Sequence, residues 1–178
     1  AANTVATAVE AWGRLDGIAN IAGVLRSGRT HEFDLDTWNR ILAVNLGGTF
    51  LMCREALPHL MESKGAIVNA ASTSSSFGHP WMAAYAASKA FVLSYGQAVR
   101  AELRGTGVSL TTLCPGPVET GFATTMGIGD EEAAKAMPSF LWVSAESVAA
   151  QAVAAGFVER AYSGNVFGYS LVFEKAAI

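Results

Sequence analysis

The sequence predicts an α/β fold, a Rossmann-like, doubly wound parallel sheet, and three observations lead to it. Short apolar strand segments alternate with helical segments along the 178 residues. Each strand segment is a continuous apolar run without polar alternation, which is typical of strands covered on both faces. Glycine, serine or proline loops follow the strands, at the edge where parallel sheets gather functional residues. We therefore expect one domain, residues 1–178, with its site at that edge.

The first half of the chain gives two helices and a strand. A helix over "ANTVATAVEAWG" should end at Gly13, because glycine readily adopts the left-handed conformation that terminates helices. An apolar strand over residues 17–22 follows and stops at Gly23. Asp36 is expected to cap the next helix, "DTWNRILAV", which continues after Asn45 as "LGGTFLMCREALPHLM".

The second half continues the alternation. The strand "GAIVNAAS" enters a serine-rich loop, and a long helix should run from about Trp81 to Leu103. The stretch "GVSLTTLCPGPVET" is a third strand, broken by Pro115, Gly116 and Pro117. A helical stretch from Asp130, a helix from Ser144 to about Glu159, and the strand "GNVFGY" complete the chain. Such a sheet normally begins with a strand, whereas this chain begins in a helix, so the pattern indicates the back part of a domain.

Composition excludes several classes of function. The net charge of −3, the pI near 5.6 and the lack of a basic run argue against a nucleic-acid partner. Cys53 and Cys114 lie far apart without metal-ligand spacing, so we expect no metal and a reducing compartment. There is no apolar run of membrane-spanning length and no secretory signal pattern. We expect a soluble, cytoplasmic protein that binds no membrane.

The stretch "YAASK" places Tyr85 and Lys89 four residues apart, just over one helical turn. Alone, this spacing is as typical of a solvated helix face as of a site. Together with four other motifs it resembles the short-chain dehydrogenase/reductase family. The motifs are "NIAG" at 20–23, with Ile21 where the family has a second Asn, "VNLGGTF" at 44–50, "GAIVNAAS", whose Ser72 lies thirteen residues before the tyrosine, "YAASK", and "PGPVET" at 115–120.

The resemblance implies an NAD(P)-dependent oxidoreductase that interconverts an alcohol and a carbonyl group, with Tyr85 as general acid and base. The catalytic residues it implies are Asn45, Ser72, Tyr85 and Lys89. The cofactor, NAD or NADP without a choice between them, would contact Asn20, Ala22, Gly23, Tyr85, Lys89, Pro115, Gly116, Val118 and Thr120.

The residue types suit this chemistry. Hydride transfer to or from a carbonyl carbon requires a proton donor or acceptor at the oxygen. A free tyrosine has a pKa of about 10, and a nearby ammonium such as Lys89 and a positively charged oxidised nicotinamide should both lower it. Ser72 can hold the substrate oxygen, and the resemblance implies that Asn45 anchors a water linking Lys89 to solvent.

Alternatives remain open at several positions. Ser74, Ser75 or Ser76 could replace Ser72, although the family spacing favours Ser72. Asn45 could stabilise a helix kink, and Asn20 and Gly23 could be structural. A Ser72–His79 hydrolase is disfavoured because no Gly-x-Ser-x-Gly turn exists and no acid is placed to orient the histidine. An epimerase or dehydratase is disfavoured by the short chain and the Pro-Gly loop.

The family's Gly-rich turn, which holds the dinucleotide pyrophosphate, is missing, and so is the residue that selects NAD or NADP. The segment that would contain them, two βαβ crossovers of about 60 residues, is therefore absent from the sequence. We expect that the chain omits an amino-terminal part. The alternative is a non-catalytic binding or scaffold protein that kept the fold but lost its nucleotide-binding half, and an intact mass of the source protein would separate the two.

Two further predictions concern specificity and assembly. Residues 119–142 have the place of the family's substrate loop. Five side chains there could line an apolar substrate pocket or pack onto the core: Phe122, Met126, Met137, Phe140 and Trp142. The helices "TFLMCREALPHLM" and "AFVLSYGQAVRAEL" are apolar around most of their circumference. We expect them to bury a second face in a homodimer or homotetramer, as the resemblance also implies.

Overall fold

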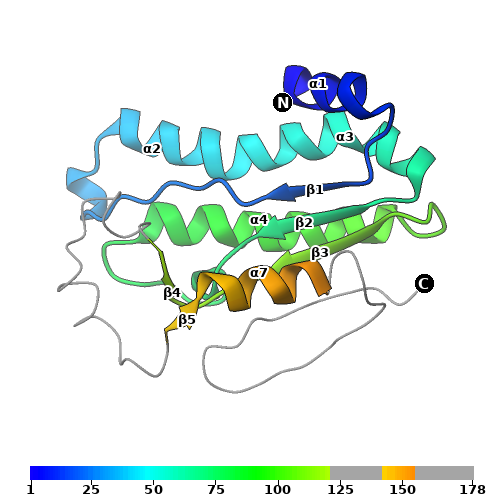
Figure 1. Ribbon diagram of the computed structural model, residues 1–178. Coiled ribbons are helices and arrows are strands. Elements are labelled where there is room, and N and C mark those ends of the chain that lie inside the picture. The colour runs from blue at the N-terminus through cyan, green and yellow to red at the C-terminus, as the bar shows by residue number, and fades with distance from the viewer. Residues whose placement is uncertain (121–141, 155–178) are drawn as a thin grey trace.

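The computed structural model describes residues 1–120 and 142–154, which are built around a three-stranded parallel sheet of order β1-β2-β3. The strands are β1 (Gly17–Asn20), β2 (Ala66–Ala70) and β3 (Ser109–Leu113). The register aligns Asn20 of β1 with Asn69 of β2, and Asn69 with Thr112 of β3. The predicted parallel α/β sheet is confirmed, and in Figure 1 the carboxyl ends of β1 and β2 point to the same side of the molecule.

Three helices pack against one face of this sheet: α1 (Ala2–Trp12), α3 (Thr49–Ser63) and α4 (Ala83–Glu102). Alternate strand residues, including Ile18, Ile67 and Leu110, point into the shared core. Figure 1 shows α4 behind the strands, while α7 (Ala145–Val153) lies in front of them. The buried members of this core are Val5, Leu15, Ile18, Cys53, Ala56, Leu60, Ile67, Val99, Leu103, Val108 and Leu110.

The helix ends agree with the sequence at one place and differ at another. Helix α1 ends at Gly13, whose φ of 72° and N–H bond to the Val9 carbonyl match the prediction. Helix α2 (Leu35–Ile41) is capped by Asp34, so the expectation of Asp36 as the cap was wrong. Asp34 lies in extended backbone and its carboxylate accepts from the Thr37 N–H at 2.9 Å, whereas Asp36 already lies in the first turn.

The helix predicted to run on after Asn45 is continuous but not uniform. A π-helical segment, η2 (Leu42–Gly48), connects α2 to α3 and contains Asn45. Single π turns occur frequently at functional sites, because the wider turn changes which groups are free to bond outside the helix. The sequence predicted the helix, but not its change of winding.

The structure also contains two very short strands, the first of which follows the Pro-Gly break in the third predicted strand. Strand β4 (Val118–Glu119) pairs in parallel with β5 (Val143–Ser144), and the Val143 N–H bonds to the Pro117 carbonyl at 3.1 Å. This pairing brings together the two ends of the proposed substrate segment. Short 3₁₀ turns, η1 (Thr30–Glu32) and η3 (Thr73–Ser75), complete the elements of the described part.

The carboxyl-terminal predictions are only partly covered. Ser144 caps α7 as expected, accepting from the Ser147 N–H at 3.1 Å, and Trp142 is half-buried. The helix from Asp130, the end of α7 near Glu159, the strand "GNVFGY" and the side chains of Phe122, Met126, Met137 and Phe140 lie outside the described residues. None of the helices in the described part has the length and apolar composition needed to cross a membrane.

Gly96 sets how closely α4 approaches the sheet. A Cβ added there would overlap the Thr112 hydroxyl oxygen of β3. We expect Gly96→Ala to lower the free energy of unfolding by about 2 kcal/mol, the usual cost of overpacking a core. Gly47→Ala is the matched control, because its Cβ would meet only the Leu42 carbonyl at 3.8 Å. Chemical denaturation of both variants checks this, and equal stability of the two would contradict it.

Candidate active site

Tyr85 and Lys89 project from the first two turns of α4 into the interior. Tyr85 is 9% exposed and Lys89 only 4%, although α4 carries exposed positions elsewhere. The pair therefore does not form a solvated helix face. A buried phenol and a buried ammonium one turn apart are unusual in a core, since burial disfavours the charged form of both.

Ser72 follows β2 directly and lies against the tyrosine. It caps η3, where its hydroxyl oxygen accepts from the Ser74 N–H at 3.1 Å. Its side chain also forms a hydrogen bond with the side chain of Tyr85. The Ser75 hydroxyl is engaged in turn by the Ser72 N–H at 3.2 Å, and Ser76 is exposed. Ser72, the serine that the family spacing favours, is therefore hydrogen-bonded to Tyr85.

Lys89 is held by the backbone of β2. Its Nζ donates to the Ala70 carbonyl at 2.7 Å and lies 5.9 Å from the centroid of the Tyr85 ring. No ion pair between Lys89 and a carboxylate occurs in the described residues. Burial therefore dominates and lowers the pKa of Lys89 to about 8, with a smaller opposing effect from Cys114.

The pKa of Tyr85 departs from the expectation. Burial raises it above the ordinary value near 10, and the hydrogen bond from Ser72 lowers it by less. The net direction is upward although Lys89 Nζ lies 5.9 Å from the centroid of the Tyr85 ring. The lowering predicted from Lys89 and an oxidised nicotinamide together is not produced by Lys89 alone, and the phenol of this structure is protonated at neutral pH.

Asn45 lies in the π-helical segment and is 1% exposed. Its Oδ1 accepts from the Val24 N–H at 2.8 Å, and its Nδ2 donates to the Val24 carbonyl at 2.9 Å and to the Ser88 hydroxyl at 2.9 Å. Both amide hydrogens are thus used. The side chain joins the loop after β1 to α4, and does not stabilise its own helix as the kink alternative required.

Gly23 leaves space beside the lysine. A Cβ at this position would lie 3.3 Å from Lys89 Nζ and 3.5 Å from Asn45 Oδ1. Asn20, three residues earlier, donates to Asn69 Oδ1 at 2.8 Å and so has a structural contact. Ala22, between them in the chain, is exposed. The "NIAG" motif therefore both ties β1 to β2 and borders the ammonium.

The Pro-Gly loop lies beside the serine loop. The Pro115 carbonyl accepts from the Thr73 N–H at 3.0 Å, and Gly116 is half-buried. Val118 lies in β4, and Thr120 is exposed at the end of the described segment. The structure thus places the loops after β2 and β3 side by side, as the parallel topology predicted.

Sequence reasoning missed three contributors: the Ser88 hydroxyl, the Ala70 carbonyl and the Asn69 amide. Ser88 accepts from Asn45, and the Ala70 carbonyl accepts from Lys89. Neither contact could be predicted from a local sequence pattern. Asn69 did carry a signal, because it is an amide within an otherwise apolar strand. No cluster of potential metal ligands occurs in the described residues.

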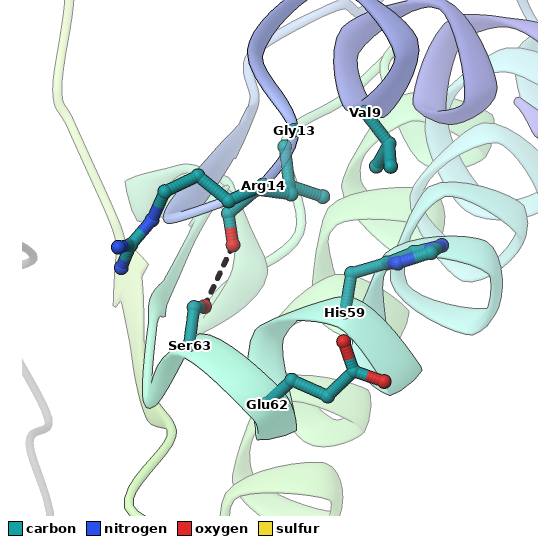
Figure 2. Close-up of a pocket in the computed structure, with 7 residues that line it drawn as sticks. Val9, Gly13, Arg14, His59, Glu62 and Ser63 are labelled. Carbon is teal, nitrogen blue, oxygen red and sulfur yellow. Dashed lines mark hydrogen bonds between the residues drawn. The ribbon is translucent and has the colours of Figure 1, made fainter.

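A separate pocket of about 250 Å³ lies between the carboxyl ends of α1 and α3 (Figure 2). Arg14, His59 and Glu62 border it, and the Ser63 hydroxyl donates to the Leu15 carbonyl at 2.7 Å. It contains none of the predicted site residues and precedes β1, at the opposite end of the strand from Asn20. We therefore do not assign the chemistry to it.

Comparison with known proteins gives a consistent result. A family model described as short chain dehydrogenase matches residues 1–131. Meso-2,3-butanediol dehydrogenase of Serratia marcescens is 40% identical over 112 residues, 62% of this chain and 44% of that protein. D-threitol dehydrogenase of Mycolicibacterium smegmatis is 36% identical over 166 residues, 92% of this chain and 63% of that protein.

A third relative is named differently. The inactive 2-(S)-hydroxypropyl-CoM dehydrogenase 2 of Xanthobacter autotrophicus is 42% identical over 127 residues, 71% of this chain and 54% of that protein. The chain thus spans about half the length of the curated relatives it matches. In structure, it resembles a gluconate 5-dehydrogenase from Burkholderia cenocepacia, crystallised with NADP and tartrate. The TM-score is 0.76 at 24% identity, covering 85% of this chain and 61% of the other, which bears on the fold.

Proposed function

The chain belongs to the short chain dehydrogenase family, and on that premise we propose that it interconverts an alcohol and a carbonyl group with NAD or NADP. The observation that supports this most is the buried trio at the carboxyl end of β2. Ser72 is hydrogen-bonded to Tyr85, and Lys89 lies one helical turn further on. An acid–base group and a hydrogen-bond donor at one point are what hydride chemistry at a carbonyl requires.

Each residue has a distinct role in this proposal. The dinucleotide, when bound, supplies or accepts the hydride. In carbonyl reduction, Tyr85 donates its proton to the oxygen, and its raised pKa keeps that proton in place at neutral pH. Ser72 donates to the same oxygen and fixes its position. In alcohol oxidation Tyr85 must accept the hydroxyl proton, which requires positive charge brought beside it to lower its pKa.

The residues present fit the nicotinamide-ribose end of such a cofactor. Gly23 keeps the space beside Lys89 open, since a side chain there would approach Nζ to 3.3 Å. Lys89 uses one hydrogen on Ala70, and its ammonium has three, so it can donate to ribose hydroxyls. We assign the remaining contacts to Asn20, Ala22, Tyr85, Pro115, Gly116, Val118 and Thr120. Asn45 would act on the proton path as an acceptor, through its backbone carbonyl or the second lone pair of Oδ1, because its side-chain amide hydrogens are occupied.

Ser72 and its neighbours offer a test with an internal control. We expect Ser72→Ala to lower kcat for a small alcohol by about 100-fold, the usual cost of losing one oxyanion donor. Ser76→Ala, an exposed serine of the same run, should leave kcat unchanged. Steady-state assays on the full-length protein with NAD or NADP and 2,3-butanediol or threitol would measure both. Loss of kcat in the Ser76 variant alone would contradict the assignment.

We further propose a homodimer or homotetramer formed through α3 and α4. Phe50 and Leu51 are about two-fifths exposed on α3, and Phe50 packs edge-on against Tyr95 of α4, which also stacks on Phe91. We expect Leu51→Glu to convert the assembly to monomers in sedimentation. Trp12→Glu, at an exposed apolar residue of α1, should not. A wild-type monomer at micromolar concentration would refute the proposal.

The substrate is proposed as a small-molecule alcohol or the matching carbonyl, with an apolar pocket as the sequence suggested. A cytoplasmic location is likewise a proposal, supported by two buried free thiols. A second candidate function is a non-catalytic member of the family, favoured by the relative that is named inactive. Absence of both dinucleotide binding and turnover in the full-length protein would support that candidate.

A further inference from the structure

A fully buried amide lies at the centre of the sheet. Asn69 is 0% exposed and occupies the middle strand, where its side chain shares the helix-covered face with Ile67. Its Oδ1 accepts from Asn20 Nδ2 at 2.8 Å. Its own Nδ2 is buried and has no hydrogen-bond partner among the described residues. The amide is thus half satisfied.

This arrangement works against stability. A buried N–H without an acceptor loses its hydrogen bonds to water and gains none in return. Leucine has a similar size, would fill the same space and would carry no unpaired N–H of its own, although it would leave Asn20 Nδ2 with only the Cys53 thiol as acceptor. Neighbouring Ile67 and Val68 show that β2 accepts apolar side chains at almost complete burial. Packing alone therefore does not explain an asparagine here.

The hydrogen bond between Asn20 and Asn69 lies where strands β1 and β2 stop pairing. Strand β1 ends at Asn20, which is the last residue in register with β2. Beyond this point the chain runs to Gly23 without ladder hydrogen bonds from β1 to hold it. The side-chain bond between Asn20 and Asn69 is therefore the final link between the strands.

Both strand ends lead to Lys89. Asn69 immediately precedes Ala70, whose carbonyl accepts from Lys89 Nζ at 2.7 Å. Asn20 lies three residues before Gly23, whose missing Cβ would stand 3.3 Å from the same Nζ. The Lys89 ammonium thus lies between the Ala70 carbonyl and the backbone of Gly23. Asn69 precedes the first of these in the chain, and Asn20 precedes the second.

A thiol from α3 completes the arrangement. Asn20 Nδ2 lies 3.4 Å from Cys53 Sγ, and Cys53 Sγ lies 3.9 Å from Asn69 Oδ1. Cys53 is itself fully buried. Asn20 therefore keeps a contact to the helix layer, but a thiol sulfur is a weak acceptor, so losing the Asn69 oxygen is still expected to loosen the end of β1.

We propose that Asn69 is a positioning residue that, through Asn20 and Ala70, holds the two strand ends which set the place of Lys89. This inference rests on the proposed function only where it speaks of turnover. If it is correct, removing the amide loosens Lys89 without weakening the core.

The test compares Asn69→Leu and Asn69→Thr with Thr111→Val in the full-length protein. Thr111→Val replaces an equally buried polar residue that pairs with Val68. Three quantities are measured: the melting temperature, kcat and KM for the dinucleotide, and the titration of the Lys89 side chain by NMR. The NMR readout needs no turnover, so an inactive wild-type protein would reject the proposed function and still leave this inference testable.

We expect Asn69→Leu to change the melting temperature little, because removal of the unpaired Asn69 N–H offsets the loss of the acceptor of Asn20. KM for the dinucleotide should rise at least about 10-fold, the range seen when a supporting residue is lost. The Lys89 pKa should move up from about 8 toward its ordinary 10.5, because a loosened ammonium reaches water. Asn69→Thr keeps an acceptor at this position, so its KM for the dinucleotide and its Lys89 pKa should both lie closer to the wild-type values. Unchanged Lys89 titration in Asn69→Leu would overturn the inference, as would a lower melting temperature with unaltered kinetics. Should Asn69→Leu fail to fold, Asn20→Ala breaks the same bridge and must give the same Lys89 change.

Discussion

Replacing Tyr85 by phenylalanine is expected to lower kcat by about 1,000-fold, within the range that positioned acid–base groups contribute. The ring stays in place, so packing in the first turns of α4 is preserved. Only the hydroxyl is lost, and with it the proton that the substrate oxygen exchanges. Ser72 retains its bond from the Ser74 N–H, so the loop after β2 should keep its shape.

The control for this prediction is binding rather than turnover. Titration of the Tyr85→Phe protein with NADH and NADPH should give dissociation constants essentially unchanged from wild type, because Lys89 and Gly23 still border the ribose site. Wild-type-like turnover in the variant would contradict the mechanism. Loss of both turnover and dinucleotide binding would show instead that the Tyr85 hydroxyl is the main contact to the cofactor and not one of several.

Lys89→Met should have effects of opposite sign on activity and on stability. In the proposed function the lysine binds the ribose and serves the proton path, so kcat/KM should fall by a factor of at least about 100. Its burial lowers its pKa from 10.5 to about 8, so the folded protein holds the charged lysine at a cost. The gap between these values corresponds to roughly 3 kcal/mol. Methionine is expected to recover a large part of this at neutral pH.

The stability difference between wild type and Lys89→Met should depend on pH, because the pKa of Lys89 differs between the folded and unfolded states. Below about pH 8 Lys89 is charged in both states and its cost is present in full. Between pH 8 and 10.5 the unfolded chain binds more protons than the folded one, so the wild-type free energy of unfolding rises with pH. Denaturation of both proteins at pH 7 and pH 10 should therefore show an advantage for Lys89→Met that narrows at the higher pH. A variant less stable than wild type at pH 7 would disprove this explanation.

Much of the fold could be predicted because its signals are local. Continuous apolar runs gave the strands, and the glycine at position 13 gave the end of α1. Parallel topology then required the loops carrying Gly23, Ser72 and Pro115 to meet at one edge, and the structure has Thr73 bonded to Pro115 there. These are consequences of chain geometry that need no knowledge of side-chain contacts.

Other features depend on contacts that the sequence does not contain. Asp34 and Asp36 are both good capping residues, and only the backbone conformation shows which one is outside the helix. The two-residue strands β4 and β5 are too short for any periodicity. The raised pKa of Tyr85 follows from burial, whereas the spacing to Lys89 suggested the opposite.

Residues with several hydrogen-bonding groups were hardest to assign. Asn45 was expected to serve a proton relay, yet its side-chain amide hydrogens are used by Val24 and Ser88. Asn20 was placed at the cofactor, and its amide bonds to Asn69. An amide's partners are chosen by the tertiary structure, so residue type alone could identify these positions but not what they contact.

One measurement tests the central proposal most directly: the reduction of NAD or NADP by the full-length protein mixed with a small alcohol, followed in wild type and in Tyr85→Phe. We predict formation of the reduced dinucleotide with the wild-type protein and at least about 100-fold less with the variant. Equal rates in the two proteins, or no reduction by wild type of either dinucleotide with any alcohol tested, would contradict it.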